Sequence, residues 1–127
     1  MTEKRIYYHD TDAGGVVYYA NYLKYLEEDR TNFLEKKGLN IKEMHENQFF
    51  YAVRNCTLNY KSPARYGDVI ICESHLVKMT AAQLIFDQKI FEKETHRLIV
   101  EAEIVLVSLN KDFKPTPIPE KIKALLS

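Results

Sequence analysis

One long stretch of this sequence has the spacing of an amphipathic helix, and its position limits the folds open to the chain. Its apolar side chains recur every three or four residues, at Tyr19, Tyr22, Leu23, Leu26, Phe33 and Leu34. This pattern predicts a helix of roughly four turns over residues 22–37. Asn21 is expected as its N-cap, because its side-chain oxygen can accept a backbone N–H, and Gly38 as the C′ residue.

Strand-type segments separated by turn residues make up most of the remaining chain. A short run at residues 4–9 precedes the helix, and longer runs follow at 49–60, 69–78, 83–92 and 98–109. In the last run, Leu98, Val100, Ala102, Ile104 and Leu106 share one face, while Glu101 and Glu103 share the other. Shorter helices are expected at 41–46 and 120–126. The order predicts an α+β fold, with an antiparallel sheet packed on the long helix.

The sheet expected here is larger than the surface that one helix can cover. Residues 1–127 contain no linker, repeat or low-complexity segment, so a single domain is expected. The final run carries apolar residues on both faces, with Val105 and Val107 opposite Ile104 and Leu106. Self-association would bury the second face and the sheet edges. A homo-oligomer is therefore predicted.

The charge balance argues against a polyanionic partner. Lys and Arg together number 18, as do Asp and Glu, so no broad positive field exists to hold nucleic acid. No signal peptide or apolar stretch of membrane-spanning length is visible, which suits a cytoplasmic protein. Cys56 and Cys72 lack metal-ligand spacing and are expected to be buried free thiols, and the histidines show no zinc pattern.

The residues best suited to chemistry lie between the first strand and the helix, in Asp10-Thr11-Asp12-Ala13-Gly14-Gly15. A carboxylate can attack a carbonyl or activate water, and free N–H groups at a helix start can stabilise an oxyanion. Thioester hydrolysis needs little more, because thiolate is a good leaving group. The same residues also form an ordinary turn and helix entry, which the physics alone favours. Asp10, at the expected strand end, is interpreted as organising the loop.

Residues 5–22 closely resemble the signature of the 4-hydroxybenzoyl-CoA thioesterase family of hotdog enzymes, especially its YbgC-like acyl-CoA thioesterases. Residues 22–31, 63–68 and 86–90 also look like the family's segments, in the same order, so the resemblance covers nearly the whole chain. It implies a hotdog fold, in which a curved antiparallel five-stranded sheet wraps around one long central helix. It also implies active sites at a homodimer interface, with dimers often pairing into tetramers.

The resemblance assigns roles to particular residues. Asp12 matches the family's catalytic carboxylate, acting as a nucleophile or general base. Tyr19 matches the position whose backbone N–H polarises the thioester carbonyl, and Gly15 lines the same turn. Many YbgC-like members have histidine at the Tyr19 position, so only the backbone contribution carries over. The hydroxybenzoyl-type proline is replaced by Ala13, which argues against assuming an aromatic substrate.

Acyl-CoA is the expected substrate, with acyl carrier protein thioesters as a second possibility. No phosphate-binding motif is present, so Lys61 and Arg65 are candidates to meet the phosphates of coenzyme A, against the alternative of an ordinary solvated loop. No further cofactor or metal is expected. Glu27, Glu28 and Asp29 are interpreted as solvated helix charges. Two other functions stay open: a non-catalytic hotdog protein that binds acyl thioesters or lipids or serves in assembly, and a hotdog dehydratase.

Overall fold

The computed structural model describes all of residues 1–127. In chain order its elements are β1 (Thr2–Arg5), the 3-10 helix η1 (Tyr8–Asp10), α1 (Asn21–Lys36), α2 (Ile41–Glu46), β2 (Phe50–Tyr60), β3 (Val69–Met79), β4 (Gln83–Glu92), β5 (Leu98–Leu109) and α3 (Glu120–Leu126). The four longer strands and both short helices lie where the sequence predicts them, within one residue at each end. None of the helices is long and apolar enough to cross a membrane.

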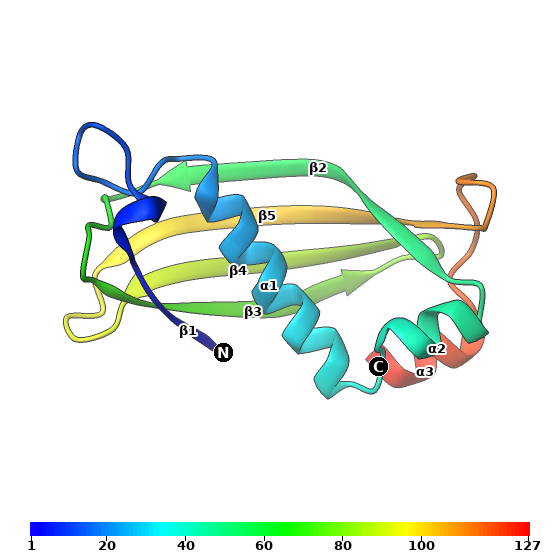
Figure 1. The fold of residues 1–127 in the computed structure, drawn as a ribbon. Coiled ribbons are helices and arrows are strands. Elements are labelled where there is room, and N and C mark those ends of the chain that lie inside the picture. Colours follow the sequence, from blue (N-terminus) through cyan, green and yellow to red (C-terminus); the bar gives the residue numbers. More distant parts are fainter.

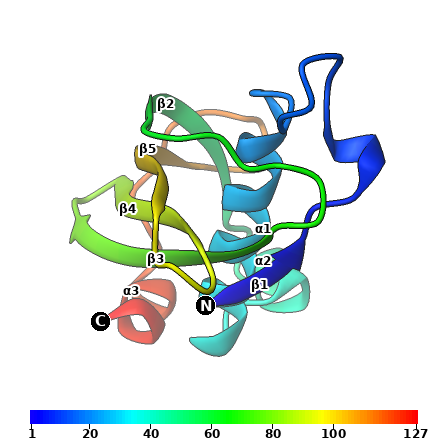
Figure 2. The ribbon, with the colours of Figure 1, turned by 90° about the vertical axis from the view of Figure 1, so that its left-hand side faces the viewer.

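All five strands form one antiparallel sheet in the order β1-β3-β4-β5-β2. The sheet is curved, and α1 crosses its concave side (Figures 1 and 2). The long strands β3, β4 and β5 are paired on both sides, whereas β1 and β2 are the edges. The α+β sheet expected from the sequence is therefore confirmed. The helical part comprises three helices of 16, 6 and 7 residues, and α2 and α3 lie together beyond the C-terminal end of α1 (Figure 1).

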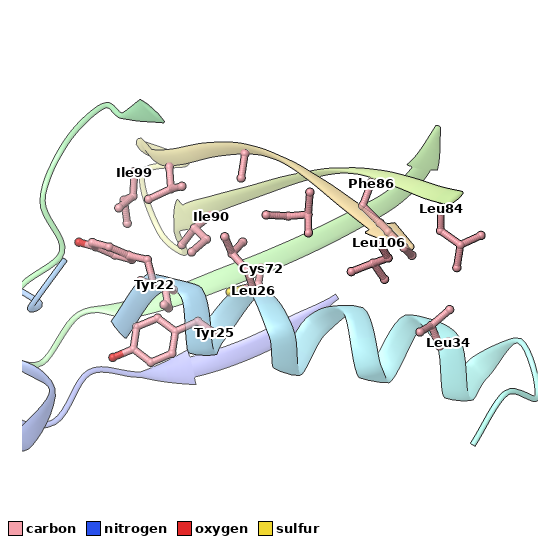
Figure 3. Close-up of a cluster of buried hydrophobic side chains, with 14 of the residues drawn as sticks. Tyr22, Tyr25, Leu26, Leu34, Cys72, Leu84, Phe86, Ile90, Ile99 and Leu106 are labelled. Carbon is pink, nitrogen blue, oxygen red and sulfur yellow. The ribbon is translucent and has the colours of Figure 1, made fainter. Parts of the chain in front are cut away.

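The hydrophobic core lies between α1 and the concave face of the sheet. From α1, Tyr22, Leu26 and Leu34 point towards the long strands, whereas the buried Tyr25 ring lies beside β1 (Figure 3). The facing side chains are Cys72, Leu84, Phe86, Ile90, Ile99 and Leu106, all almost fully buried. Full burial of a large aliphatic or aromatic side chain contributes about 1.5–3 kcal/mol. The alternation expected along residues 98–109 is confirmed, because the side chains of Val100, Ala102, Ile104 and Leu106 are buried.

The two ends of α1 differ from the expectation in one respect. Gly38 has φ +94° and follows the last turn as the C′ residue, as predicted. The N–H of Leu39 donates to the carbonyl of Leu34 at 2.9 Å, which completes the C-terminal cap. The prediction for Asn21 is wrong, because Asn21 is the first helical residue and Ala20 takes the N-cap position. The Asn21 side chain instead donates to the carbonyl of Asp10 at 2.9 Å.

Two further expectations are corrected by burial. Asp29 is not a solvated helix charge; its carboxylate is buried and accepts hydrogen bonds from the hydroxyls of Thr2 and Ser74. Glu27 and Glu28 are exposed, as expected. Cys72 is buried as predicted, but Cys56 is exposed, because β2 is an edge strand that α1 does not cover.

A buried polar network holds α1 on the sheet. Gln88 of β4 is 1% exposed, and its amide nitrogen donates to Ser74 at 2.7 Å and to the Leu26 carbonyl at 2.9 Å. Its oxygen accepts a 2.9 Å hydrogen bond from the Arg30 guanidinium. Arg30 is itself only 7% exposed, and burial lowers the pKa of its guanidinium. Because buried polar groups cost free energy unless they are paired, Gln88 fixes the rotation of α1.

Candidate active site

The first strand expected at residues 4–9 is present but lies earlier, at Thr2–Arg5, and a 3-10 turn takes the place of its predicted end. β1 ends at Arg5, because the Asp10 carboxylate accepts the N–H of Tyr7 at 2.9 Å and draws the backbone into η1. Local side-chain bonds of this kind compete with a strand ladder. The Tyr25 hydroxyl donates to the other Asp10 oxygen at 2.8 Å. Asp10 is 2% exposed and therefore organises the loop, as the sequence suggests.

The charge on Asp10 is stabilised despite its burial. Burial by itself would raise the pKa of this carboxyl. Hydrogen bonds from the Tyr7 N–H and the Tyr25 hydroxyl, with the nearby charges of Lys4 and His9, more than offset that effect and leave the pKa below its ordinary value. The backbone carbonyl of Asp10 also accepts the Tyr18 N–H at 3.0 Å. Asp10 thus holds together both ends of the loop that carries Asp12.

Asp12 lies at the tip of this loop in a tight turn. Its N–H donates to the Val16 carbonyl at 2.9 Å, and its carbonyl accepts the Gly15 N–H at 3.0 Å. Gly15 has φ +80°, a conformation that favours glycine. The Oδ1 atom accepts the Gly14 N–H at 2.8 Å, and a Cβ at Gly14 would lie 3.2 Å from that oxygen. The turn therefore fixes one carboxylate oxygen and leaves Oδ2 exposed without a partner.

Tyr19 follows the turn but lies two residues before the first residue of α1. The expected helix-start position is therefore slightly wrong: Tyr19 belongs to the approach to the helix. Its backbone N–H has no acceptor within the chain, whereas the N–H groups of Val17 and Tyr18 donate to Ala64 and Asp10. The Tyr19 N–H is thus free to bind a ligand; we call the segment from Val16 to Ala20, between the Asp12 turn and α1, the return arm of the loop. A hydrogen-bond donor of this kind can bind a carbonyl oxygen.

The Tyr19 side chain belongs to a cluster of aromatic rings. The Tyr60 ring from the end of β2 packs edge-on against Tyr19, with ring centroids 6.5 Å apart, and lies 5.8 Å from the ring of Tyr22. The Tyr60 hydroxyl donates to the Tyr19 carbonyl at 3.5 Å. Tyr60 is a site residue that the sequence does not predict. Its contact depends on the pairing of β2 with β5, and only the abundance of tyrosines in the sequence could have hinted at it.

The loop over residues 63–68 packs directly on the Asp12 turn. The Val17 N–H donates to the Ala64 carbonyl at 2.8 Å, and Arg65 forms a β-bridge with Val16. The structure therefore brings Arg65 beside the turn, and its guanidinium has no carboxylate partner. Lys61 differs, because its ammonium lies 3.8 Å from the carboxylate of Glu101 on β5. Of the two basic candidates, Arg65 is the one placed next to the turn without a counter-charge.

A separate apolar cavity of about 300 Å³ lies between α1 and β2. It is lined by Leu23, Arg30, Val53, Cys56 and Ile104. Asp12 lines none of the main cavities of the protomer and sits on an exposed surface. No group of three or more His, Cys, Asp or Glu side chains is arranged to hold a metal ion. The site within one protomer thus consists of a partly free carboxylate, a free N–H and aromatic walls.

Comparison with known proteins gives a consistent result. Residues 7–126 match the family model described as the thioesterase-like superfamily. The acyl-CoA thioester hydrolase YbgC of Escherichia coli O157:H7 is 35% identical over 121 residues, covering 94% of this chain and 90% of that protein. A chloroplastic acyl-acyl carrier protein thioesterase of Arabidopsis thaliana is 30% identical, covering 96% of this chain and 64% of that protein. The solved structure of a probable thioesterase from Bartonella henselae superposes with a TM-score of 0.85 at 28% identity, covering 93% of this chain and 97% of that one.

Proposed function

This chain belongs to the thioesterase-like superfamily and is a hotdog thioesterase acting on acyl-CoA, and we propose that Asp12 is its catalytic carboxylate. One observation carries the assignment. The turn fixes Asp12 Oδ1 on the Gly14 N–H and leaves Oδ2 exposed, while the Tyr19 N–H on the return arm has no acceptor. An acyl transfer site needs such a pair: a group that attacks or activates water, and a donor for the developing oxyanion.

The reaction follows from these two groups. In the general-base route, Oδ2 takes a proton from water as the water oxygen bonds to the thioester carbon. In the nucleophilic route, Oδ2 itself bonds to that carbon, and water later cleaves the resulting anhydride. In both, the carbonyl oxygen becomes an oxyanion that accepts the Tyr19 N–H. The carbon–sulfur bond then breaks, and coenzyme A leaves as a thiolate, so the products are a carboxylic acid and free coenzyme A.

The test is Asp12→Asn, followed by release of free thiol from a panel of acyl-CoA chain lengths that includes benzoyl types. Loss of the charged oxygen is expected to lower kcat by about 10²–10⁴-fold. Asn at this position can still accept the Gly14 N–H, so the fold and oligomer are retained. Asp112→Asn, at an exposed site in the loop after β5, is the matched control. Turnover by Asp12→Asn equal to that of the control contradicts the assignment.

A single-turnover reaction in labelled water separates the two routes. Label that enters the Asp12 carboxylate indicates an anhydride intermediate, because water then attacks the side-chain carbonyl. Label found only in the released acid, with none in the protein, supports general-base catalysis. Mass spectrometry of the tryptic peptide that contains Asp12 reads the result.

The working unit is proposed to be a homodimer, with a dimer of dimers as the larger alternative. β2 presents 11 residues of unpaired sheet edge, and its exposed residues include Val53 and Cys56. These residues line the open apolar cavity beside α1, which acts as the central helix of the hotdog fold. Pairing with a second copy would satisfy the edge and cover the cavity. It would also shield the exposed Asp12 site from bulk solvent, which strengthens the electrostatic contacts there while the reacting water is retained.

The substrate is proposed to be an acyl-CoA, so coenzyme A enters as part of the substrate and no further cofactor is needed. Arg65, which has no carboxylate partner and lies next to the turn, is the better of the two candidates for a phosphate contact. Lys61 could join it only by leaving Glu101. One relative is named an acyl-acyl carrier protein thioesterase, so a carrier-protein thioester is the alternative substrate that we test against acyl-CoA.

A further inference from the structure

Two tyrosines beside the Asp12 loop are largely exposed. Tyr8 in η1 is 80% exposed and Tyr66, in the loop between β2 and β3, is 60% exposed. Their rings meet edge-on with centroids 6.3 Å apart. Both side chains are thus accessible to a ligand from solvent. Exposed aromatic groups of this kind mark binding surfaces more often than they stabilise a fold.

The backbone holds both rings in place. The Thr11 N–H and hydroxyl both donate to the Tyr8 carbonyl, at 3.0 and 2.6 Å. Tyr66 occupies the second position of a four-residue turn closed by the Asp68 N–H, which donates to the Arg65 carbonyl at 3.0 Å. Gly67 at the third position has φ +87°, as a type II turn requires. The rings are therefore presented by rigid backbone, which lowers the entropy lost when a ligand binds.

The segments that carry these rings also carry two arginines without a carboxylate partner, Arg5 and Arg65. The Arg5 guanidinium stacks over the Tyr7 ring at 5.6 Å, and neither Arg5 nor Arg65 has a carboxylate within ion-pair distance. The nearest acidic residue of the loop, Asp68, lies 3.7 Å from Arg97 and accepts the Arg65 N–H, so its charge is already engaged. We call Arg5, Tyr7, Tyr8, Arg65 and Tyr66 the aromatic–basic stripe. It combines ring faces with guanidinium groups suited to phosphate.

The stripe is continuous with the candidate active site. Ile6 exchanges backbone hydrogen bonds with the loop, donating to Asp68 at 2.8 Å and accepting from Gly67 at 2.9 Å. Arg65 is bridged to Val16, which closes the Asp12 turn. Figure 1 shows η1, the Asp12 loop and the β2–β3 loop at the same end of the sheet, opposite the loop that follows β5. A ligand that reaches Asp12 from this end passes over the stripe.

We propose that the aromatic–basic stripe binds the nucleotide portion of coenzyme A, with adenine against the Tyr8–Tyr66 pair and phosphates on Arg65 and Arg5. This inference rests on the proposed thioesterase function and extends it to the carrier. Adenine stacks on tyrosine rings, and guanidinium groups bind phosphate in a forked geometry. An acyl carrier protein thioester has no adenine, so it cannot use the Tyr8–Tyr66 pair in this way. The stripe therefore selects acyl-CoA over the carrier-protein thioester.

The experiment compares an acyl-CoA with the same acyl group on pantetheine, which lacks the nucleotide. Tyr66→Leu and Arg65→Gln are each expected to lower the ratio of kcat/KM values, acyl-CoA over acyl-pantetheine, by about tenfold. Added salt should lower the same ratio for the unmodified enzyme, because it screens the phosphate contacts. Phe113→Leu and Lys111→Gln, in the loop after β5 at the opposite end, are the matched aromatic and charge controls, expected to leave the ratio unchanged.

Calorimetry with adenosine bisphosphate tests nucleotide binding by the stripe independently of turnover. The unmodified protein should bind this nucleotide, and Tyr66→Leu should weaken binding about tenfold. The stripe is overturned if Tyr66→Leu lowers kcat/KM equally for acyl-CoA and acyl-pantetheine, so that their ratio does not change. It is also overturned if Tyr66→Leu changes the oligomeric state. Both outcomes are independent of the result for Asp12→Asn. If Asp12→Asn stays active while the nucleotide binds through the stripe, the catalytic assignment fails and the binding site stands.

Discussion

The Tyr25 hydroxyl donates a 2.8 Å hydrogen bond to Asp10 Oδ1, which ties the beginning of α1 to the 3-10 helix just before Asp12. Tyr25 is almost fully buried, and burial together with the Asp10 contact raises the pKa of its hydroxyl. The hydroxyl therefore stays a donor throughout the ordinary pH range. Through this contact, the packing of the core determines where the candidate catalytic loop lies.

Tyr25→Phe tests that link through stability. A hydrogen bond to a charged group contributes about 1.5–3 kcal/mol, so the free energy of unfolding should fall by about that amount at neutral pH. The pKa of Asp10 is lowered on folding, so its stabilisation is present above the unfolded pKa of about 3.9 and is lost as pH falls through the lower folded value. The difference between variant and unmodified protein should shrink in that acidic range. Urea denaturation at several pH values measures it, and a pH-independent difference contradicts this account.

Gly15→Ala tests the conformation of the Asp12 turn. Gly15 has φ +80°, and nothing lies within 4 Å of an added Cβ, so the cost is backbone strain and not a clash. Loss of about 1 kcal/mol of stability and a larger loss of kcat are expected, since the carboxylate shifts with the turn. Gly38→Ala, with φ +94° at the far end of α1, should cost similar stability while kcat is kept. Equal kcat for both variants would show that the turn tolerates the change.

Gln88→Leu tests the network beneath α1. The substitution leaves the Arg30 guanidinium buried without an acceptor, so a loss of about 2–4 kcal/mol is expected. Adding Arg30→Met removes the stranded charge, and the double variant should lose less than the sum of the two single losses. Chemical denaturation of all four proteins gives the coupling free energy. Strict additivity would show that the two side chains do not depend on each other.

Val53→Glu tests the proposed dimer. Val53 lies on the free edge strand and lines the open cavity, so a charge there should oppose pairing with a second copy. A shift to monomer and a matching loss of thioesterase activity are expected. Val77→Glu is the matched control, since Val77 on β3 is 51% exposed, as Val53 is. Sedimentation velocity measures the oligomeric state. An unmodified enzyme that is monomeric and fully active would contradict the proposed dimer.

Much of the architecture follows from local patterns in the sequence. Strand-type runs between turn residues define β2 to β5, and in β4 and β5 the buried side chains alternate with more exposed ones, a pattern that can be seen without a partner. Gly38 ends α1 because the backbone there needs a positive φ. The strand predicted at residues 4–9 is confirmed only at Lys4 and Arg5. Its later residues have an aromatic composition that suits a strand, but the Asp10 carboxylate accepts the Tyr7 N–H and η1 forms there. One side-chain hydrogen bond thus outweighs the strand propensity of these residues.

The sequence by itself determined the fold class, the thioesterase family and the motif that contains Asp12, Gly15 and Tyr19, because these depend on periodicity and on the order of residues. Only the tertiary structure decided which residues surround that motif. Tyr60, Arg65 and Tyr66 are more than 40 residues away in the chain and reach the Asp12 loop through strand pairing and the β2–β3 loop. Asp29 is interpreted from the sequence as a solvated helix charge but is buried, because the hydroxyl groups that donate to it come from Thr2 on β1 and Ser74 on β3. Contacts between distant segments have no local signature, and they set the environment in which Asp12 acts.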